Sequence, residues 1–113
     1  MSSISIADVN PPQNVTARMP RPYHDEMKQR AVRWGLRVND YYVQVIEAFV
    51  SDELPQRQHL YATPSFAVPI SVPMPTAFVE RVRSAAKAKG ATMNELVITA
   101  VALHLKTNAT TSA

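Results

Sequence analysis

The chain contains two glycines, Gly35 and Gly90, and both open a six-residue segment of the same kind. Gly35-Leu-Arg-Val-Asn-Asp and Gly90-Ala-Thr-Met-Asn-Glu start 55 residues apart, and each follows a basic, helix-like pattern and precedes an apolar one. Glycine just beyond a helical pattern is typical of a helix C-terminus, because glycine adopts positive φ without steric cost. The repeat therefore predicts a duplicated unit, which leaves few ways for so short a chain to fold.

Each copy begins with the pattern of a short strand. Residues 14–19 alternate between polar and apolar side chains and are followed by Pro20, which is typical of a half-buried strand. A shift of 55 residues gives residues 69–74, followed by Pro75. Apolar residues fall on apolar residues in the two copies, so both strands are predicted to bury one face.

Two helical patterns follow each strand. In the first copy one helix is expected from about Pro22 to Trp34, and a second from about Val38 to Val50 carries a wide apolar stripe. The second copy repeats both stripes, with His104 as the one polar departure. The basic residues Lys28, Arg30, Lys87 and Lys89 are expected on solvated helix surface.

These patterns divide the chain into five segments and predict its fold class. We expect a mobile N-terminal arm (1–13), a first unit (14–50), a linker (51–68), a second unit (69–105) and a polar tail (106–113). A unit of about 37 residues cannot bury its own core. The expected fold is therefore mainly α with a two-stranded antiparallel ribbon: two β-α-α units that form a pseudo-dimer. The linker is long enough for pairing within one chain, while pairing between two chains stays open.

Composition narrows the class of protein further. The 113 residues carry a net charge of +3 and no cysteine, which excludes disulfides and thiolate metal sites and fits a cytoplasmic protein. No apolar run is long enough to span a bilayer and no signal-peptide pattern opens the chain, so we expect no membrane association. The positive charge permits a polyanionic partner but does not demand one.

The order strand, proline, helix, Gly-x-(Ser/Thr)-x-Asn-acidic, helix resembles that of ribbon-helix-helix DNA-binding proteins, the superfamily of the Arc and MetJ repressors. The first unit, from Ala17-Arg-Met-Pro-Arg through Gly35-Leu-Arg-Val-Asn39, looks Arc-like. Two units in one chain resemble the TraY-type proteins of conjugative plasmids. The resemblance covers both units but not the arm, the linker or the tail. It implies that the ribbon lies in the major groove of double-stranded DNA and reads base edges.

The resemblance, carried over by position, assigns base reading to Asn14, Thr16 and Arg18 in the first strand and to Ser71 in the second. Arginine can contact guanine, asparagine pairs with adenine, and threonine offers a hydroxyl and a methyl group. Pro69 and Pro73 occupy the other two outward positions of the second strand, so direct readout is expected to be lopsided. Either the DNA site is asymmetric or the second strand mainly supports the first.

The resemblance also implies phosphate contacts around the start of each second helix, where free backbone amides and the helix dipole favour an anion. The expected contacting residues are Arg21, Arg37, Asn39, Thr92 and Asn94. Thr92 could equally be an ordinary helix cap, whereas Arg37 is a poor cap but a good phosphate partner.

The expected function is sequence-specific DNA binding by a small transcriptional regulator, a repressor that occupies its operator, with further self-association on DNA left open. One alternative is an accessory protein of conjugative plasmid DNA processing, and another is a protein-interaction module with a degenerate ribbon. Residues 90–105 also resemble a helix of acyltransferase and condensation enzymes, but that interpretation leaves the first unit unexplained. We expect no catalysis, no cofactor and no metal, because the three histidines lack metal-ligand spacing and no nucleophile–base pair is evident.

Overall fold

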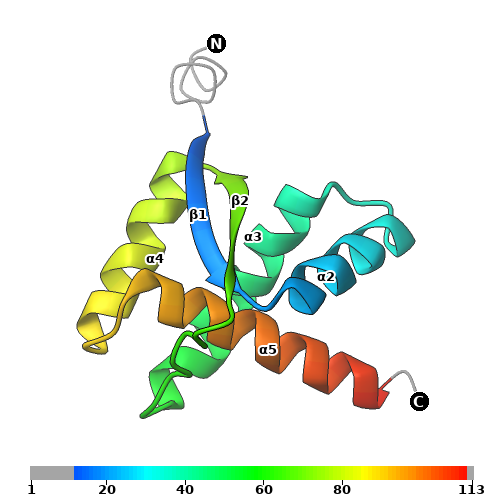
Figure 1. Ribbon diagram of the computed structural model, residues 1–113. Coiled ribbons are helices and arrows are strands. Elements are labelled where there is room, and N and C mark those ends of the chain that lie inside the picture. Colours follow the sequence, from blue (N-terminus) through cyan, green and yellow to red (C-terminus); the bar gives the residue numbers. More distant parts are fainter. Residues whose placement is uncertain (1–11, 112–113) are drawn as a thin grey trace.

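The computed structural model describes residues 12–111 and the side chains of residues 12–106. The elements are β1 (Gln13–Met19), α2 (Arg21–Arg33), α3 (Val38–Ala48), β2 (Val68–Met74), α4 (Thr76–Ala88) and α5 (Met93–Thr111). The two strands lie side by side between α2 and α4, and α5 contacts β1 and the other three helices (Figure 1). Most of the predicted arm, residues 1–11, lies outside the described residues.

The strands β1 and β2 form one antiparallel two-stranded sheet. Thr16 lies opposite Ser71, and the pairing extends from Gln13 opposite Met74 to Met19 opposite Val68. Thr16 and Ser71 are equivalent positions of the 55-residue repeat, so the register is symmetric about this pair. Side chains alternate between the two faces of the sheet because successive residues of a strand point to opposite sides. The inner face is apolar and buried, and is made of Ala17, Met19, Ile70, Val72 and Met74.

Two prolines lie within β2 without breaking the ladder. The backbone N–H of Arg18 points away from β2, because it donates to the side chain of Asn94. Residues directly opposite each other in an antiparallel pair point their amides either both toward the partner or both away from it. Pro69 lies opposite Arg18, so its nitrogen faces the free edge, as does that of Pro73 four residues on. Neither proline therefore removes a ladder hydrogen bond.

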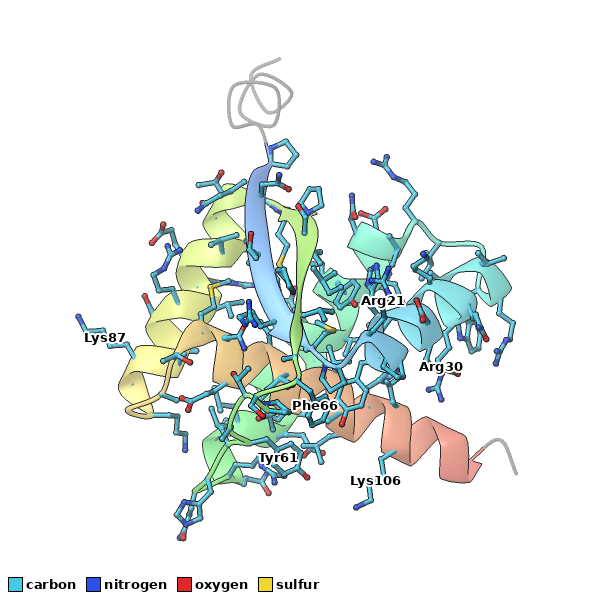
Figure 2. All side chains as sticks on the ribbon, viewed as in Figure 1. Arg21, Arg30, Tyr61, Phe66, Lys87 and Lys106 are labelled. Carbon is cyan, nitrogen blue, oxygen red and sulfur yellow. The ribbon has the colours of Figure 1, made fainter. Side chains whose placement is uncertain are left out.

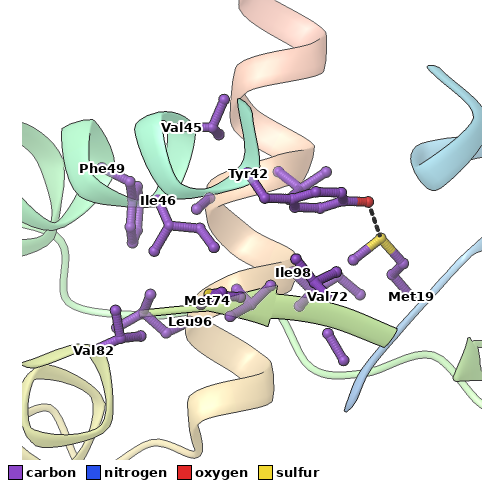
Figure 3. Packing of buried hydrophobic residues seen from close by; sticks show 14 of the residues in the cluster. Met19, Tyr42, Val45, Ile46, Phe49, Val72, Met74, Val82, Leu96 and Ile98 are labelled. Atoms are coloured by element: carbon purple, nitrogen blue, oxygen red, sulfur yellow. Dashed lines mark hydrogen bonds between the residues drawn. The ribbon is translucent and has the colours of Figure 1, made fainter. Parts of the chain in front are cut away.

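One hydrophobic core joins the inner face of the ribbon to the helices (Figure 3). Tyr42 of α3 is fully buried in it and donates its hydroxyl proton to Sδ of Met19 at 3.5 Å. From α5, Leu96 and Val101 are buried completely. Full burial of an aliphatic side chain contributes about 1.5–3 kcal/mol, so the ribbon is stabilised chiefly by the helices beneath it.

The predicted fold class is wrong as it was stated, because the chain is not two equivalent β-α-α units. After α3 the chain forms a π-helical turn at Phe49–Glu53 and a 3-10 turn at Leu54–Gln56, both within or beside the expected linker. The halves also differ in length, since α3 has 11 residues and α5 has 19. The structure supports a mainly helical fold with one two-stranded antiparallel sheet, in an element order compatible with two β-α-α units.

Local chemistry explains both departures. Pro55 has no N–H to donate to the carbonyl four residues earlier, so the α-helix cannot continue through it, and buried Leu54 anchors the altered turn in the core. At the other end, no proline or glycine follows residue 105. Helix α5 therefore continues to Thr111, into the segment that was expected to be a polar tail.

Both glycines end a helix as predicted. Gly35 and Gly90 each have φ of 70°, a conformation that other residues rarely adopt. After α2, the N–H of Leu36 donates to the carbonyl of Ala31 at 2.8 Å, and after α4 the N–H of Ala91 donates to Ala86 at 3.0 Å. This is the Schellman arrangement, which satisfies carbonyls that a helix end would otherwise leave unpaired.

Candidate nucleic-acid interface

The outer face of the ribbon brings the four expected base-reading residues together. Asn14, Thr16, Arg18 and Ser71 are all exposed, on two strands that are paired directly. Asn14 lies opposite Pro73, Thr16 opposite Ser71, and Arg18 opposite Pro69. The two polar side chains in the middle of this face are thus neighbours across the ribbon, and the prolines lie toward its two ends.

The side chains of Asn14 and Ser71 bind each other. Ser71 donates its hydroxyl proton to Oδ1 of Asn14 over a distance of 3.0 Å, diagonally across the two strands. The amide group of Asn14 keeps its two N–H donors, and its oxygen has a second lone pair. This bond orients Asn14 but leaves it with donors for a ligand.

Arg18 is held at both its backbone and its side chain. One Nη of its guanidinium donates to the carbonyl of Ala67, just before β2, at 2.9 Å. Four of the five guanidinium N–H groups remain after that bond. The neighbouring Phe66 is 71% exposed, and Figure 2 places it by the start of β2. Sequence reasoning predicted neither the contact of Arg18 with the carbonyl of Ala67 nor the exposed Phe66 beside it, because the linker has no clean period.

The start of α5 is closed by its own side chains. The hydroxyl of Thr92 accepts the backbone N–H of Glu95 at 3.1 Å, and Oε1 of Glu95 accepts the backbone N–H of Thr92 at 2.9 Å. This is a capping box, and its Thr-x-x-Glu spacing is visible in the sequence. Thr92 therefore acts as the ordinary helix cap that was one of its two interpretations.

Asn94 is also engaged within the protein. Its Oδ1 accepts the N–H of Arg18 at 2.6 Å, and its Nδ2 donates to the carbonyl of Arg18 at 3.0 Å and to Oγ1 of Thr63 at 2.7 Å. The side chain joins α5 to the free edge of β1 and to the linker. Both side-chain N–H groups of Asn94 are thus used within the protein. The hydroxyl of Thr92 accepts a hydrogen bond in the capping box and keeps its O–H as a donor.

The start of α3 differs. Arg37 occupies the N-cap position, is exposed, and makes no side-chain capping bond. Asn39 corresponds to Asn94 in the repeat, but its strand counterpart is Pro73, which has no N–H to donate. Among the described residues, the side chain of Asn39 forms no hydrogen bond. A carboxylate, Asp40, lies in the first turn here, as Glu95 does in α5.

The arginines fall into two groups by their ion pairs. Arg57, Arg81 and Arg83 pair with Glu53, Glu47 and Glu80, at 4.0, 2.9 and 3.1 Å. Within residues 12–111, the arginines without an ion pair all lie between residues 18 and 37: Arg18, Arg21, Arg33 and Arg37. Arg21 is exposed at the start of α2 (Figure 2). The unpaired arginines thus belong to the first copy, whereas the second copy has exposed lysines, Lys87 and Lys89, at the end of α4.

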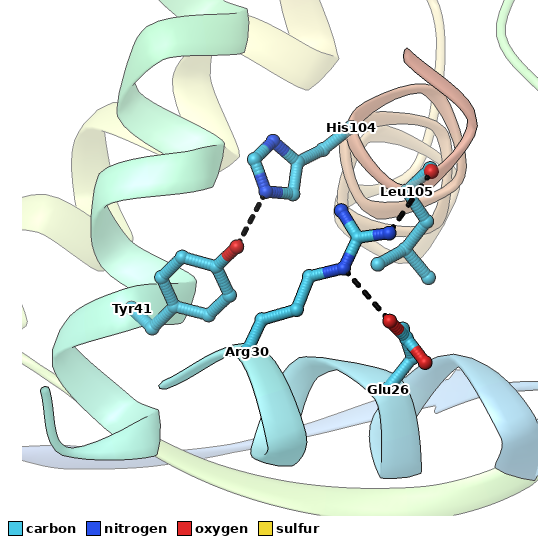
Figure 4. A network of polar contacts seen from close by, with 5 residues as sticks. All are labelled: Glu26, Arg30, Tyr41, His104 and Leu105. Carbon is cyan, nitrogen blue, oxygen red and sulfur yellow. Dashed lines mark hydrogen bonds and ion pairs between the residues drawn. The ribbon is translucent and has the colours of Figure 1, made fainter. Parts of the chain in front are cut away.

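Arg30 corrects one expectation, because it is only 8% exposed and does not lie on solvated surface. Its Nε donates to Oε2 of Glu26 at 2.9 Å, and one Nη donates to the carbonyl of Leu105 at 3.3 Å (Figure 4). Beside it, the hydroxyl of Tyr41 and Nε2 of His104 lie 2.7 Å apart. This network fastens α2 to α3 and to α5.

Burial shifts the pKa values of groups in this network. The pKa of His104 is lowered, first by burial and then by the nearby charge of Arg30. Burial likewise raises the pKa of Tyr41. His24 shows the same direction as His104, because burial and then the positive charge of Lys28 lower its pKa. Burial thus favours the neutral form of both histidines.

Within the described residues, no three His, Asp or Glu side chains gather closely enough to hold a metal ion. None of the helices in residues 12–111 is both long and apolar enough to cross a bilayer. Comparison of the chain with family models, with curated proteins and with solved structures found no match. The ribbon-helix-helix resemblance therefore stays a prediction that rests on the residues quoted for it.

Proposed function

We propose that this protein binds double-stranded DNA in a sequence-specific manner and acts as a small transcriptional regulator, a repressor that occupies its operator. The observation that carries the proposal is the exposed outer face of the ribbon, where Asn14, Thr16, Arg18 and Ser71 come together. A major groove about 12 Å wide admits a two-stranded ribbon. A two-stranded sheet with an exposed polar face is the kind of element that such a groove admits, which supports the proposal.

The chemistry of this face suits base edges. Arg18 keeps four N–H donors for guanine O6 and N7, and Asn14 keeps both N–H donors for adenine or another acceptor. Thr16, in the middle of the face, offers a hydroxyl and a methyl group. Such groups distinguish base pairs, whereas phosphate contacts alone would give binding without sequence preference.

Positive charge near the ribbon supports binding to a polyanion. Arg21 and Arg37 are exposed and have no ion pair within the described chain, and Arg37 begins a helix whose first amides are free of a side-chain cap. A phosphate at that helix start would gain from the amides, the dipole and the guanidinium together. Asp40 opposes this attraction in part.

The edges of the ribbon favour the DNA proposal over an interaction module that adds a strand. Pro69 and Pro73 remove N–H donors from the free edge of β2, and Asn94 occupies the free edge of β1 at Arg18. A partner strand would therefore lack backbone hydrogen-bonding groups at both edges of the ribbon. A partner is therefore expected to bind the polar outer face of the ribbon rather than its edges. We propose neither catalysis nor a cofactor. A cytoplasmic location fits this function.

Selection from a pool of random duplexes tests the proposal, with the mass of the free and the bound protein measured by light scattering. We expect an enriched sequence motif, and binding that weakens as salt rises. The mass reports whether one chain is sufficient or further copies join on DNA. A protein that retains no duplex at low salt would refute DNA binding and leave the interaction module.

An accessory role in DNA processing is separable from repression on the same selected sequence. A circular-permutation gel assay reports bending of the DNA, and a transcription assay with the motif placed over a promoter reports repression. Repression without a large bend is the expected result. Strong bending without repression would favour the accessory role.

A further inference from the structure

The surfaces that the two copies would present to DNA are chemically different. Under the proposed function, a ribbon with two equal strands would read a site with two-fold symmetry, because equivalent residues would meet both halves of the site. The register makes the comparison direct, since Thr16 and Ser71 face each other and the copies extend symmetrically from that pair. Differences between the copies then become differences between the two halves of the DNA site.

The strands differ in hydrogen-bonding capacity. Arg18 of β1 corresponds to Pro73 of β2, and Asn14 corresponds to Pro69. A proline side chain has no donor or acceptor, so it can contribute only apolar contact, for example with a thymine methyl group. Polar readout on β2 is restricted to Ser71, which already donates to Asn14.

The starts of α3 and α5 also differ, and again the first copy has more groups available to DNA. At α5 the capping box uses Thr92 and Glu95, and the side chain of Asn94 is bound to Arg18 and Thr63. At α3 the equivalent positions, Arg37 and Asn39, remain available. The cause lies partly in the ribbon: Pro73 cannot offer Asn39 the N–H that Arg18 offers Asn94.

The pairing of the arginines follows the same division. Every arginine after residue 37 that the structure describes is paired with a glutamate, whereas Arg18, Arg21 and Arg37 are unpaired. The second copy keeps two exposed cations, Lys87 and Lys89, at the end of α4. Base-reading donors, a helix start without a side-chain cap and unpaired arginines thus occur together in the first copy.

We infer that the protein binds a non-palindromic duplex site in a single orientation. The hydrogen bonds to base edges come from β1, and the main phosphate contact lies at the start of α3. This inference rests on the proposed function and adds the class of DNA sequence to it. The β2 half contributes shape and apolar contact. The bound protein would therefore have a defined orientation along the DNA.

The symmetry of the selected motif tests the inference with the full chain. Random duplexes are selected and sequenced, and the orientation is then read by tethering a DNA-cleaving iron chelate to an introduced cysteine, Ser84→Cys, on exposed α4. We expect a motif without two-fold symmetry and cleavage on one side of it. A palindromic motif, or equal cleavage on both sides, would overturn the orientation while leaving DNA binding intact. Failure to retain any duplex would overturn both.

Cross-strand partners supply matched variants for the selected site. Arg18→Ala is expected to weaken binding by about tenfold to a hundredfold, because a guanine contact is lost. Pro69→Ala, at the residue directly opposite, is expected to change affinity less than about threefold. Because Arg18 also donates a hydrogen bond to the carbonyl of Ala67, each variant is first checked for a wild-type thermal unfolding transition. A second pair of opposite residues, Asn14→Ala and Pro73→Ala, gives the same comparison without the Ala67 contact. Equal losses from β1 and β2 variants would overturn the inference.

Discussion

The side-chain amide of Asn94 brackets the backbone of Arg18, accepting its N–H at 2.6 Å and donating to its carbonyl at 3.0 Å. A helix start is thereby fixed to the free edge of a strand from a distant part of the sequence. Its repeat equivalent, Asn39, forms no such contact in the described structure. Both residues are asparagines, but the strand residue that corresponds to Arg18 for Asn39 is Pro73, which has no N–H.

Asn94→Ala is therefore expected to destabilise the protein by about 1–2 kcal/mol, because it removes three hydrogen bonds, to Arg18 and Thr63. Urea denaturation followed by circular dichroism measures the change in the free energy of unfolding. The matched control is Asn39→Ala, which is expected to stay within about 0.5 kcal/mol of the wild type. Equal losses in the two variants would show that the bracket has no energetic consequence.

Arg37→Ala is expected to weaken binding to all duplexes alike, because a phosphate contact carries no sequence information. The slope of log K against log salt should fall by about 1. Arg83→Ala removes the same charge from exposed α4, where Arg83 is paired with Glu80, and serves as the control. If both variants changed the slope equally, net charge rather than a contact would be responsible.

Val72→Lys should prevent folding. Val72 is 1% exposed on the inner face of the ribbon, and a lysine there would place an unpaired charge in the core. That penalty is several kcal/mol, against a total stability of about 5–15 kcal/mol for a domain. Ser71→Lys, one residue away on the exposed face, should fold normally. Thermal unfolding by circular dichroism measures both, and a cooperative wild-type transition for Val72→Lys would contradict the buried face.

Stability is expected to fall as the pH drops below about 6.5, through protonation of His104 and His24. Their folded-state pKa values lie below the ordinary 6.5, so between those values and 6.5 the unfolded chain binds more protons. Stability is then fully present above pH 6.5 and is lost as the pH falls through the folded-state pKa values. Urea denaturation across this range measures the slope.

His104→Gln should reduce that slope, because glutamine keeps a polar group near Tyr41 but does not titrate. A wild-type slope in the His104 variant would mean that the network around Arg30 does not sense pH.

Gly35→Ala is expected to cost about 1–2 kcal/mol, because φ of 70° is unfavourable for a residue with a Cβ atom. Apart from the two chain neighbours of Gly35, no heavy atom of the described residues lies within 4 Å of the added Cβ, so the cost comes from the backbone conformation. Gly35→Asn should cost less, since asparagine tolerates this conformation better. Thermal denaturation ranks the two variants, and the reverse order would argue against a left-handed turn.

Local patterns located most of the elements. The period of two in residues 14–19 located β1 to within one residue, and the helical stripe that starts at Val38 located α3. Gly35 and Gly90 marked the ends of two helices in the sequence, because glycine adopts a positive φ more readily than other residues do. The capping box at Thr92 was also legible in the sequence, because Thr-x-x-Glu is a local signal.

Features that depend on several local effects at once were harder to predict. The altered turn around Pro55 and the continuation of α5 to Thr111 overturned the expectation of two equal units. Arg30 was assigned to the surface because its charge suggested it, yet it is buried with Glu26 and the carbonyl of Leu105 as partners. Its Nη1 is buried without a hydrogen-bond partner. Burial of a charge depends on partners that are remote in sequence, 75 residues away for Leu105.

The sequence by itself determined the repeat, the alternation of the strands and the left-handed turns, because each depends on residues within a few positions of one another. Only the tertiary structure decided which of two like asparagines is bound and which is free. Asn94 meets an N–H donor on β1, and Asn39 has a proline as its counterpart on β2. Pairing of the strands brings together residues that are far apart in the sequence, and that juxtaposition makes the two halves unequal.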